Sequence, residues 1–299
     1  MKGLFANRSL FFQLGVLIVG LLTGSIFGTI AIQGILLIAG DTAAAGLQHG
    51  PVWVLQATQF LSSVFLFLLP AGFTAWFCSE RPKEFLHLHG FPELRLLLAV
   101  ALATFLISPS ISLAGYFNMQ MQLPSFMAPV EAWMKASEEL AADIIEHMIS
   151  GKGILSFIIN LVVIAVMAGI TEEFLFRGAL FSIFRKKIRS HHVVIWVVAV
   201  IFSAIHCQFY GFIPRMLLGA YLGYLLHWTK NIWVPVFAHF LNNAAAMTGM
   251  SDDRLKENAF FAEELAPGDL GWFSLVAGIS LILFAGCILW IRRSAMRNI

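Results

Sequence analysis

The sequence predicts an all-α integral membrane protein, and three observations support this. Of its 299 residues, 59% are hydrophobic and only 12% are charged, whereas a typical soluble domain has about 25% charged residues. The mean hydropathy is +0.82. The apolar residues form long unbroken runs, unlike the alternating segments of about ten residues that build membrane β-barrels. Because only helices and closed barrels satisfy their backbone hydrogen bonds in lipid, these runs predict a polytopic bundle of transmembrane helices.

The apolar runs divide into eight candidate spans, which we expect to form a single integral membrane domain over residues 1–299. The first run is longer than the apolar core of about 7 to 15 residues in a cleaved signal peptide, so we interpret it as a span. The eight spans cover about residues 10–38, 52–77, 95–117, 154–184, 192–209, 212–229, 231–249 and 271–291.

The distribution of Lys and Arg predicts the orientation, because these residues accumulate in cytoplasmic loops. With eight spans, thirteen of the 19 fall on the side of both termini and four on the other side. We therefore expect cytoplasmic termini, and location in the inner membrane if the source is bacterial. The net charge of the chain is only +2, and its basic residues are confined to short loops. Both observations argue against a nucleic-acid partner. The thirteen are Lys2, Arg8, Arg81, Lys83, Arg95, Arg185, Lys186, Lys187, Arg189, Lys230, Arg292, Arg293 and Arg297; the four are Lys135, Lys152, Arg254 and Lys256.

An amphipathic pattern covers residues 129–150, between the third and fourth spans. Its period predicts a helix that lies on the membrane surface or caps the bundle. A lid that controls substrate entry is the alternative. The apolar side is formed by Trp133, Leu140, Ile144 and Met148, and the acidic side by Glu138, Glu139 and Asp143.

Three ionisable residues interrupt the fourth span: Glu172, Glu173 and Arg177. Each would cost about 2.5 to 3.5 kcal/mol at the centre of a lipid-facing helix, so they must face protein or water. Glu173 and Arg177 are four residues apart in the favourable order and are expected to pair. Glu172 points about 100° away on the helix and remains available for chemistry. The alternative is that the cluster is purely a structural lock between helices.

Two later spans supply further polar side chains at helical spacing. Phe202 and His206 are four residues apart in the fifth span, as are His239 and Asn243 in the seventh. At about 1.5 Å per residue, Glu172, His206 and Asn243 all lie roughly 20 Å from the basic hairpins, and His239 lies one turn nearer to them. A carboxylate and an imidazole can activate water, and an imidazole and an amide can stabilise an oxyanion. This combination indicates amide hydrolysis.

Catalysis without a metal ion is the favoured mechanism, because the compact HExxH helix of many zinc proteases is absent from the sequence. A zinc ion is the alternative, with Glu172, His206 and His239 as its three ligands. Asn243 would be a poor fourth ligand, and it suits an oxyanion donor better.

The three motifs resemble the signatures of the type II CAAX prenyl protease family, also called the CPBP or Abi family of intramembrane proteases. The resemblance covers about residues 154–249, the expected catalytic core. The motifs are Glu172-Glu173-xxx-Arg177, Phe202-xxx-His206 and His239-xxx-Asn243.

This resemblance implies an endopeptidase, named a metalloprotease in the family, that acts in the lipid bilayer on a CAAX-like or other membrane-associated peptide or protein. It implies that Glu172 and His206 activate water while His239 and Asn243 form the oxyanion site. Glu173, Arg177 and Phe202 would organise the site. The alternatives are a non-catalytic membrane receptor or scaffold and, less favoured, a proton-coupled transporter. A transporter is less favoured because two matching halves with Gly/Pro-interrupted spans are not evident in the sequence.

Overall fold

The computed structural model describes residues 1–40, 50–256, 265 and 267–297, and within these ranges the regular structure is helical throughout. Each of the eight predicted apolar segments forms a helix or a continuous series of helical segments. These are α1 (Leu10–Ala39); α2 (Val52–Ser63), η2 (Val64–Leu68) and α3 (Leu69–Cys78); α5 (Leu94–Met119); α7 (Ile154–Asn160), η4 (Leu161–Met167), α8 (Ala168–Glu173), η5 (Phe174–Leu180) and α9 (Phe181–Arg185); α10 (His191–Ala204); α11 (Phe212–Thr229); α12 (Trp233–Ser251); and α14 (Leu270–Arg297).

Short elements connect these helices. They are α4 (Pro82–Phe85), η3 (Ser125–Met127), the amphipathic α6 (Ala128–Ile149), α13 (Asp253–Lys256) and η6 (Pro267–Asp269).

Five helical stretches in the described part of the chain are long and apolar enough to cross a membrane, and α10 is a shorter apolar helix. The protein is therefore an all-helical, multi-pass integral membrane protein. The five stretches are Leu10–Ala39, Val52–Cys78, Leu94–Met119, Ile154–Arg185 and Leu270–Ala295.

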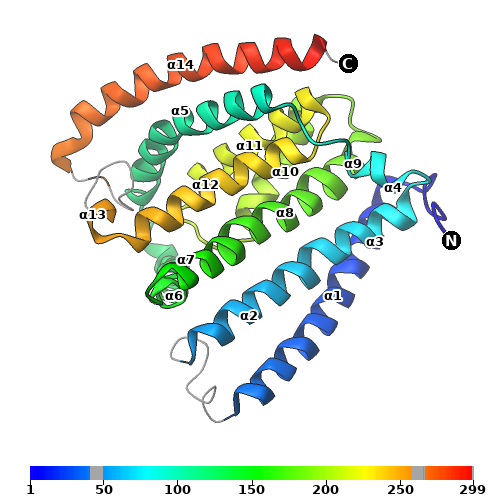
Figure 1. The fold of residues 1–299 in the computed structure, drawn as a ribbon, viewed down its shortest axis with the longest axis horizontal. Coiled ribbons are helices and arrows are strands. Elements are labelled where there is room, and N and C mark those ends of the chain that lie inside the picture. Colours follow the sequence, from blue (N-terminus) through cyan, green and yellow to red (C-terminus); the bar gives the residue numbers. More distant parts are fainter. Residues whose placement is uncertain (41–49, 257–264, 266, 298–299) are drawn as a thin grey trace.

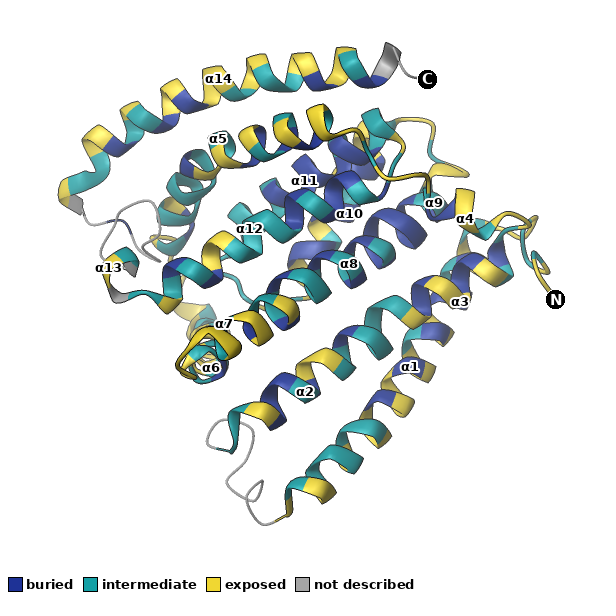
Figure 2. Cartoon of the chain, viewed as in Figure 1, coloured by how far each residue is buried: buried dark blue, intermediate teal, exposed yellow. Residues whose placement is uncertain are grey.

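The helices pack in a series from α14 on one side to α1 on the other (Figure 1). Helix α14 packs on α5, which contacts α11 and α12; α10 lies against α11, and α12 against α8. Helix α3 contacts η5, and α1 packs on α2 and α3. Figure 2 shows that α8 and α11 are mostly buried or partly buried, whereas α1 and α14 expose much of their surface. Many large apolar side chains on α1 and α14 are exposed, as expected for helices that face lipid.

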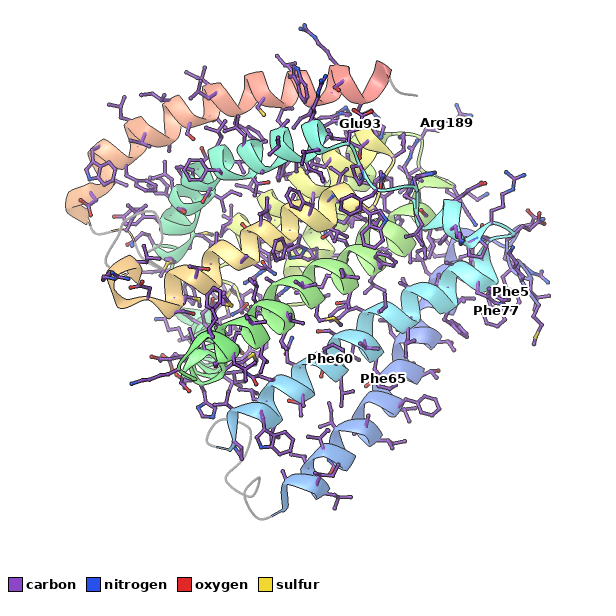
Figure 3. All side chains as sticks on the ribbon, viewed as in Figure 1. Phe5, Phe60, Phe65, Phe77, Glu93 and Arg189 are labelled. Atoms are coloured by element: carbon purple, nitrogen blue, oxygen red, sulfur yellow. The ribbon has the colours of Figure 1, made fainter. Side chains whose placement is uncertain are left out.

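Both termini lie at the same end of the bundle (Figure 1). Polar contacts join several helix connections at this end. The Lys186 ammonium donates to the Cys78 carbonyl at 2.8 Å, and the Asn231 amide donates to the Gly90 carbonyl at 2.7 Å. Figure 3 shows Arg189 at this end as well. The connections expected to carry the cytoplasmic charges therefore gather around the two termini.

The amphipathic segment predicted as a helix is α6, and it packs at the opposite end of the bundle. The Trp133 ring lies 5.3 Å from that of Phe209, and the Glu138 carboxylate accepts a hydrogen bond from the Tyr210 amide at 3.3 Å. Both contacts reach the loop of residues 205–211 between α10 and α11. Helix α6 therefore caps the bundle, in agreement with the first of the two expectations for this segment.

The predicted fifth span, 192–209, is wrong at its C-terminal end, because α10 ends at Ala204. After Ile205 the α-helical hydrogen-bond pattern ends, and the His206 amide donates to the Ser203 carbonyl, three residues earlier, at 3.3 Å. Cys207 then adopts a left-handed backbone, with φ at 53°, which turns the chain away from the helix axis. His206 therefore lies just beyond the helix rather than within it.

Helix α12 begins at Trp233, two residues later than predicted, so that Pro235 lies in its first turn. Proline is tolerated there because the backbone N–H groups of the first turn have no partner within the helix. The helix consequently continues unbroken through His239 and Asn243, as the depth estimate from the sequence assumed.

Candidate active site

Two neighbouring carboxylates on α8 form the centre of the site, and α8 itself lies between the π-helical segments η4 and η5. Just before them, Gly169 allows α12 to approach. A Cβ atom at Gly169 would lie 3.2 Å from both the Phe240 nitrogen and the Val236 oxygen. Close approach of helix backbones at small residues is typical of membrane proteins. Here it brings Glu172 and Glu173 next to His239.

Glu173 and Arg177 form the ion pair that their spacing predicts. The Arg177 Nη1 atom donates to the Glu173 Oε1 atom at 2.7 Å, and both side chains are fully buried. Arg177 also donates from Nη2 to the Gly219 carbonyl on α11 at 2.9 Å, and its guanidinium stacks 4.6 Å from the Phe202 ring. The pair thus joins η5 to both α10 and α11.

Glu173 also holds His239. Its Oε1 atom accepts a second hydrogen bond, from His239 Nδ1, at 2.8 Å. A carboxylate can only accept in this contact, so Nδ1 carries the proton and Nε2 is directed elsewhere. The Nε2 atom lies 3.9 Å from the Glu172 Oε2 atom. A buried carboxylate therefore sets the ring orientation of His239 from one side, as in catalytic triads.

Glu172 faces a cavity rather than the protein interior, and about 15% of its side chain is exposed. The sequence leaves it without a local partner, and the structure revises this: His239 is its neighbour, at 3.9 Å. That separation is longer than a hydrogen bond. Glu172 is therefore close to a polar group while its carboxylate stays accessible from the cavity.

His206 lies in the turn that follows α10. Its Nδ1 atom is 2.7 Å from the Phe202 carbonyl oxygen. Because a carbonyl can only accept, Nδ1 must be the protonated nitrogen, and Nε2 of the neutral ring is left with a free lone pair. The Phe202 ring packs against His206 at 5.1 Å and against His239 at 5.9 Å, so it separates and positions both imidazoles.

A single cavity of about 400 Å³ brings together the four side chains expected to perform chemistry. They come from three parts of the chain: α8 contributes Glu172, the turn after α10 contributes His206, and α12 contributes the other two. Residues of α5, α6 and α11 complete the walls. The lining consists of Ile111, Ile145, Ile164, Glu172, Phe202, His206, Gly211, Pro214, Arg215, Leu218, His239, Asn242, Asn243, Ala246, Met247 and Met250.

Asn243 is oriented by its neighbours on α12 and η4. Its Oδ1 atom accepts from the Asn242 amide at 3.3 Å, and its Nδ2 atom donates to the Ile164 carbonyl at 3.4 Å. An amide nitrogen carries two hydrogens. One of them therefore remains for a group bound in the cavity.

Three residues near the site escaped the sequence-based reasoning: Asn118, Arg215 and Asn242. Arg215 and Asn242 line the cavity, and Asn118 holds the backbone of the loop that carries His206. A signal was available for Arg215, which is a lone charge one turn inside an apolar segment. No comparable signal marks the asparagines, since buried amides occur in many membrane helices.

The donor set does not fit a three-ligand metal site. Within the described residues, no group of three or more His, Cys, Asp or Glu side chains is arranged to hold a metal ion. The Nδ1 atoms of His206 and His239 are hydrogen-bonded, to a carbonyl and to Glu173 respectively, so that only Nε2 of each ring could serve as a ligand. The arrangement thus does not supply the zinc ligands that the sequence offers as an alternative, Glu172, His206 and His239.

Comparison with known proteins identifies the segment that contains the site. Residues 154–245 match the family model described as type II CAAX prenyl endopeptidase, Rce1-like. The uncharacterized protein YpbD of Bacillus subtilis (strain 168) is 30% identical over 89 residues, which are 28% of this chain and 42% of YpbD. The match thus spans less than half of that relative. No solved structure is similar to the chain. The family resemblance inferred from the three motifs is confirmed over this segment.

Proposed function

We propose that the Rce1-like segment at residues 154–245 makes this chain an intramembrane endopeptidase for a membrane-associated peptide or protein. The observation that carries the proposal is the shared cavity, which is lined by Glu172, His206, His239 and Asn243 from α8, the turn after α10 and α12. Its walls belong to a membrane-embedded bundle, so the peptide bond would be cleaved within or beside the bilayer.

In the proposed reaction, Glu172 and the free Nε2 atom of His206 hold a water molecule in the cavity. The Glu172 carboxylate takes a proton from the water as the water oxygen bonds to the substrate carbonyl carbon. The carbonyl becomes an oxyanion, which accepts hydrogen bonds from His239 and Asn243. When the C–N bond breaks, the proton held by Glu172 passes to the leaving amine.

The buried Glu173 supports the oxyanion step. It accepts the Nδ1 proton of His239 and so fixes the ring, and in the protonated imidazole Nε2–H can donate to the oxyanion. Arg177 holds Glu173 in place through a hydrogen bond of 2.7 Å. The three residues thus form a fixed electrostatic framework behind the reacting groups.

We further propose hydrolysis without a metal ion and without another cofactor. The donor geometry supports this, because no His, Cys, Asp or Glu side chains of the described residues form a three-ligand set. Purified chain should keep its activity after treatment with a zinc chelator. Activity that is lost on chelation and restored by zinc would contradict this part of the proposal and leave the peptidase assignment standing.

The proposed topology has eight spans with both termini in the cytoplasm. Five stretches in the described part of the chain meet the length and hydropathy of spans. Helices α10, α11 and α12 would supply the other three, and their packing inside the bundle explains how shorter or more polar helices are accommodated. The two termini at one end support an even number of crossings.

The test of the proposed activity is cleavage by the purified full chain in detergent or vesicles, with a quenched fluorescent library of apolar peptides. Glu172→Gln and His206→Ala should each lower the rate by about a hundredfold or more, since both touch the reacting water. Their melting temperatures should stay near that of the unmodified chain, because neither belongs to the Glu173–Arg177 pair. Cleavage at a normal rate by either variant would refute the assignment of that residue.

A non-catalytic receptor or scaffold is the competing function, and the Glu173–Arg177–His239 network would also suit a structural lock. A lock does not require Glu172 to face a cavity or His206 to keep a free ring nitrogen. Failure of the unmodified chain to cleave any library member, in detergent and in vesicles, would favour the scaffold.

A further inference from the structure

A fourth charged or ionisable side chain lines the same cavity, and the proposed reaction does not use it. Arg215 lies in the first turn of α11, and its guanidinium carries five N–H donors. Gln208 accepts two hydrogen bonds from it, one at Oε1 from Nη2 at 2.6 Å and one at its carbonyl from Nη1 at 3.4 Å. Three donors therefore remain after the contacts with Gln208.

The charge of Arg215 is not neutralised by a close partner. Within the described part of the chain, no carboxylate lies within the 4.0 Å that defines an ion pair with this guanidinium. Arg177 differs in this respect, since it is bonded to Glu173 at 2.7 Å. Glu138 and Glu172 act on Arg215 electrostatically, but from beyond that distance. An anion in direct contact with the guanidinium would therefore add a charge-assisted hydrogen bond that neither carboxylate makes.

The space beside Arg215 is open on its cavity side. Gly211 borders the guanidinium so closely that a Cβ atom at Gly211 would lie 3.2 Å from Nη2. Apolar side chains, among them Ile111, Leu218 and Met247, form much of the remaining wall. These apolar walls would partly shield a bound anion from water, which strengthens its attraction to the guanidinium.

We propose that Arg215 binds a carboxylate of the peptide substrate and so determines which peptides this chain cleaves. The inference rests on the proposed function and adds the chemical class of the substrate to it. A planar guanidinium fork matches a carboxylate in a bidentate arrangement. The carboxylate is either the α-carboxylate at the peptide C-terminus or an Asp or Glu side chain.

Two features of the cavity determine where this carboxylate lies in the substrate. The volume of about 400 Å³ is near the lower end of small-ligand pockets, so the bound carboxylate belongs to a residue close to the scissile bond. Glu172 lines the same cavity and repels a second carboxylate. The positive charge of Arg215 offsets this repulsion, and without it an acidic peptide would be excluded.

The test measures binding separately from cleavage, on the full-length Glu172→Gln chain. Three fluorescent probe peptides share one apolar sequence: the first ends in a free carboxylate, the second in a carboxamide, and the third in a carboxamide with one internal Glu. At least one acidic form should bind about ten- to a hundredfold more tightly than the neutral carboxamide, the range of a charge-assisted hydrogen-bonded contact. The preferred acidic form identifies the source of the carboxylate.

When Arg215→Gln is added, the affinity ratio of the acidic probe to the neutral carboxamide probe should fall close to one. Arg215→Lys keeps the positive charge but lacks the planar guanidinium, so it should give an intermediate ratio. Arg254→Gln is the matched control, because Arg254 is exposed and bonded to Asp252 outside the cavity; it should leave the ratio unchanged. No preference for an acidic form, a preference that survives Arg215→Gln, or no binding of any probe overturns the proposal. A preference that depends on Arg215, combined with no peptide cleavage by the unmodified chain that keeps Glu172, supports the binding site and refutes the peptidase.

Discussion

Glu172 and Glu173 are adjacent in the sequence and have opposite environments. The rotation of about 100° per helical residue turns Glu172 toward the cavity and Glu173 toward the interior. Glu173 is held between Arg177 and His239 by two hydrogen bonds, whereas the Glu172 carboxylate faces the cavity. Of these two chemically identical side chains, Glu173 has the structural role and Glu172 the proposed catalytic role.

The buried pair should contribute to stability as well as to activity. Removing one partner, in Glu173→Gln or Arg177→Met, leaves an uncompensated buried charge and should lower the free energy of unfolding by about 3 to 5 kcal/mol. Thermal unfolding in detergent measures this loss. The matched control is Arg81→Met, because Arg81 and Glu84 form an exposed ion pair at 3.3 Å; exposed pairs contribute about 0 to 1 kcal/mol. An Arg177→Met chain as stable as the unmodified protein would refute the structural role.

At the scale of elements, the loop of residues 205–211 decides where His206 lies. Asn118 on α5 holds this loop through both ends of its amide. Its Nδ2 atom donates to the Phe209 carbonyl at 2.9 Å, and its Oδ1 atom accepts from the Ile213 nitrogen at 2.7 Å. Loop backbone in a membrane protein needs such partners, since lipid supplies none.

Replacing Asn118 with Leu keeps the side-chain size and removes both hydrogen bonds. Each backbone group left without a partner costs about 1 to 3 kcal/mol, so the loop should open more often than the rest of the bundle. We expect faster hydrogen exchange at residues 205–213 and a peptidase rate lowered by about tenfold, equivalent to about 1.4 kcal/mol of lost positioning.

Asn160→Leu is the control for this prediction. Asn160 is also buried and accepts a hydrogen bond from Gln56 at 2.8 Å, away from the loop. It should destabilise the protein without accelerating exchange at residues 205–213. Equal exchange in that segment for the two variants would show that Asn118 does not hold the loop.

At the scale of the whole molecule, the helix connections gather at two ends of the bundle, with both termini at one of them (Figure 1). In the proposed topology, Lys187 lies on the cytoplasmic side and Lys152 on the opposite side. Both side chains are exposed. This arrangement can be tested by labelling, because the side chains are accessible to reagents that do not cross the membrane.

The labelling experiment uses a background in which the three native cysteines, Cys78, Cys207 and Cys287, are replaced by Ala. In sealed vesicles of known orientation, a membrane-impermeant maleimide should reach Lys187→Cys only from the cytoplasmic face and Lys152→Cys only from the other face. Both variants should react fully after detergent is added. Labelling of both from one face would show that the number of crossings between them is even.

The sequence by itself determined the all-helical class, the position of the eight apolar segments to within a few residues at most ends, and the three motifs. These follow from local chemistry, since lipid requires helices and a buried charge requires a partner four residues away. The Glu173–Arg177 pair is the clearest confirmed case.

Only the tertiary structure decided which imidazole lies near which carboxylate. His239 is bonded to Glu173 and adjacent to Glu172 because α12 packs against α8 at Gly169, and His206 lies in a turn held from α5. The same packing places Arg215 in the cavity without a close carboxylate. Spacing along a chain specifies contacts within one helix, whereas contacts between helices depend on their separation and rotation, which many side chains determine together.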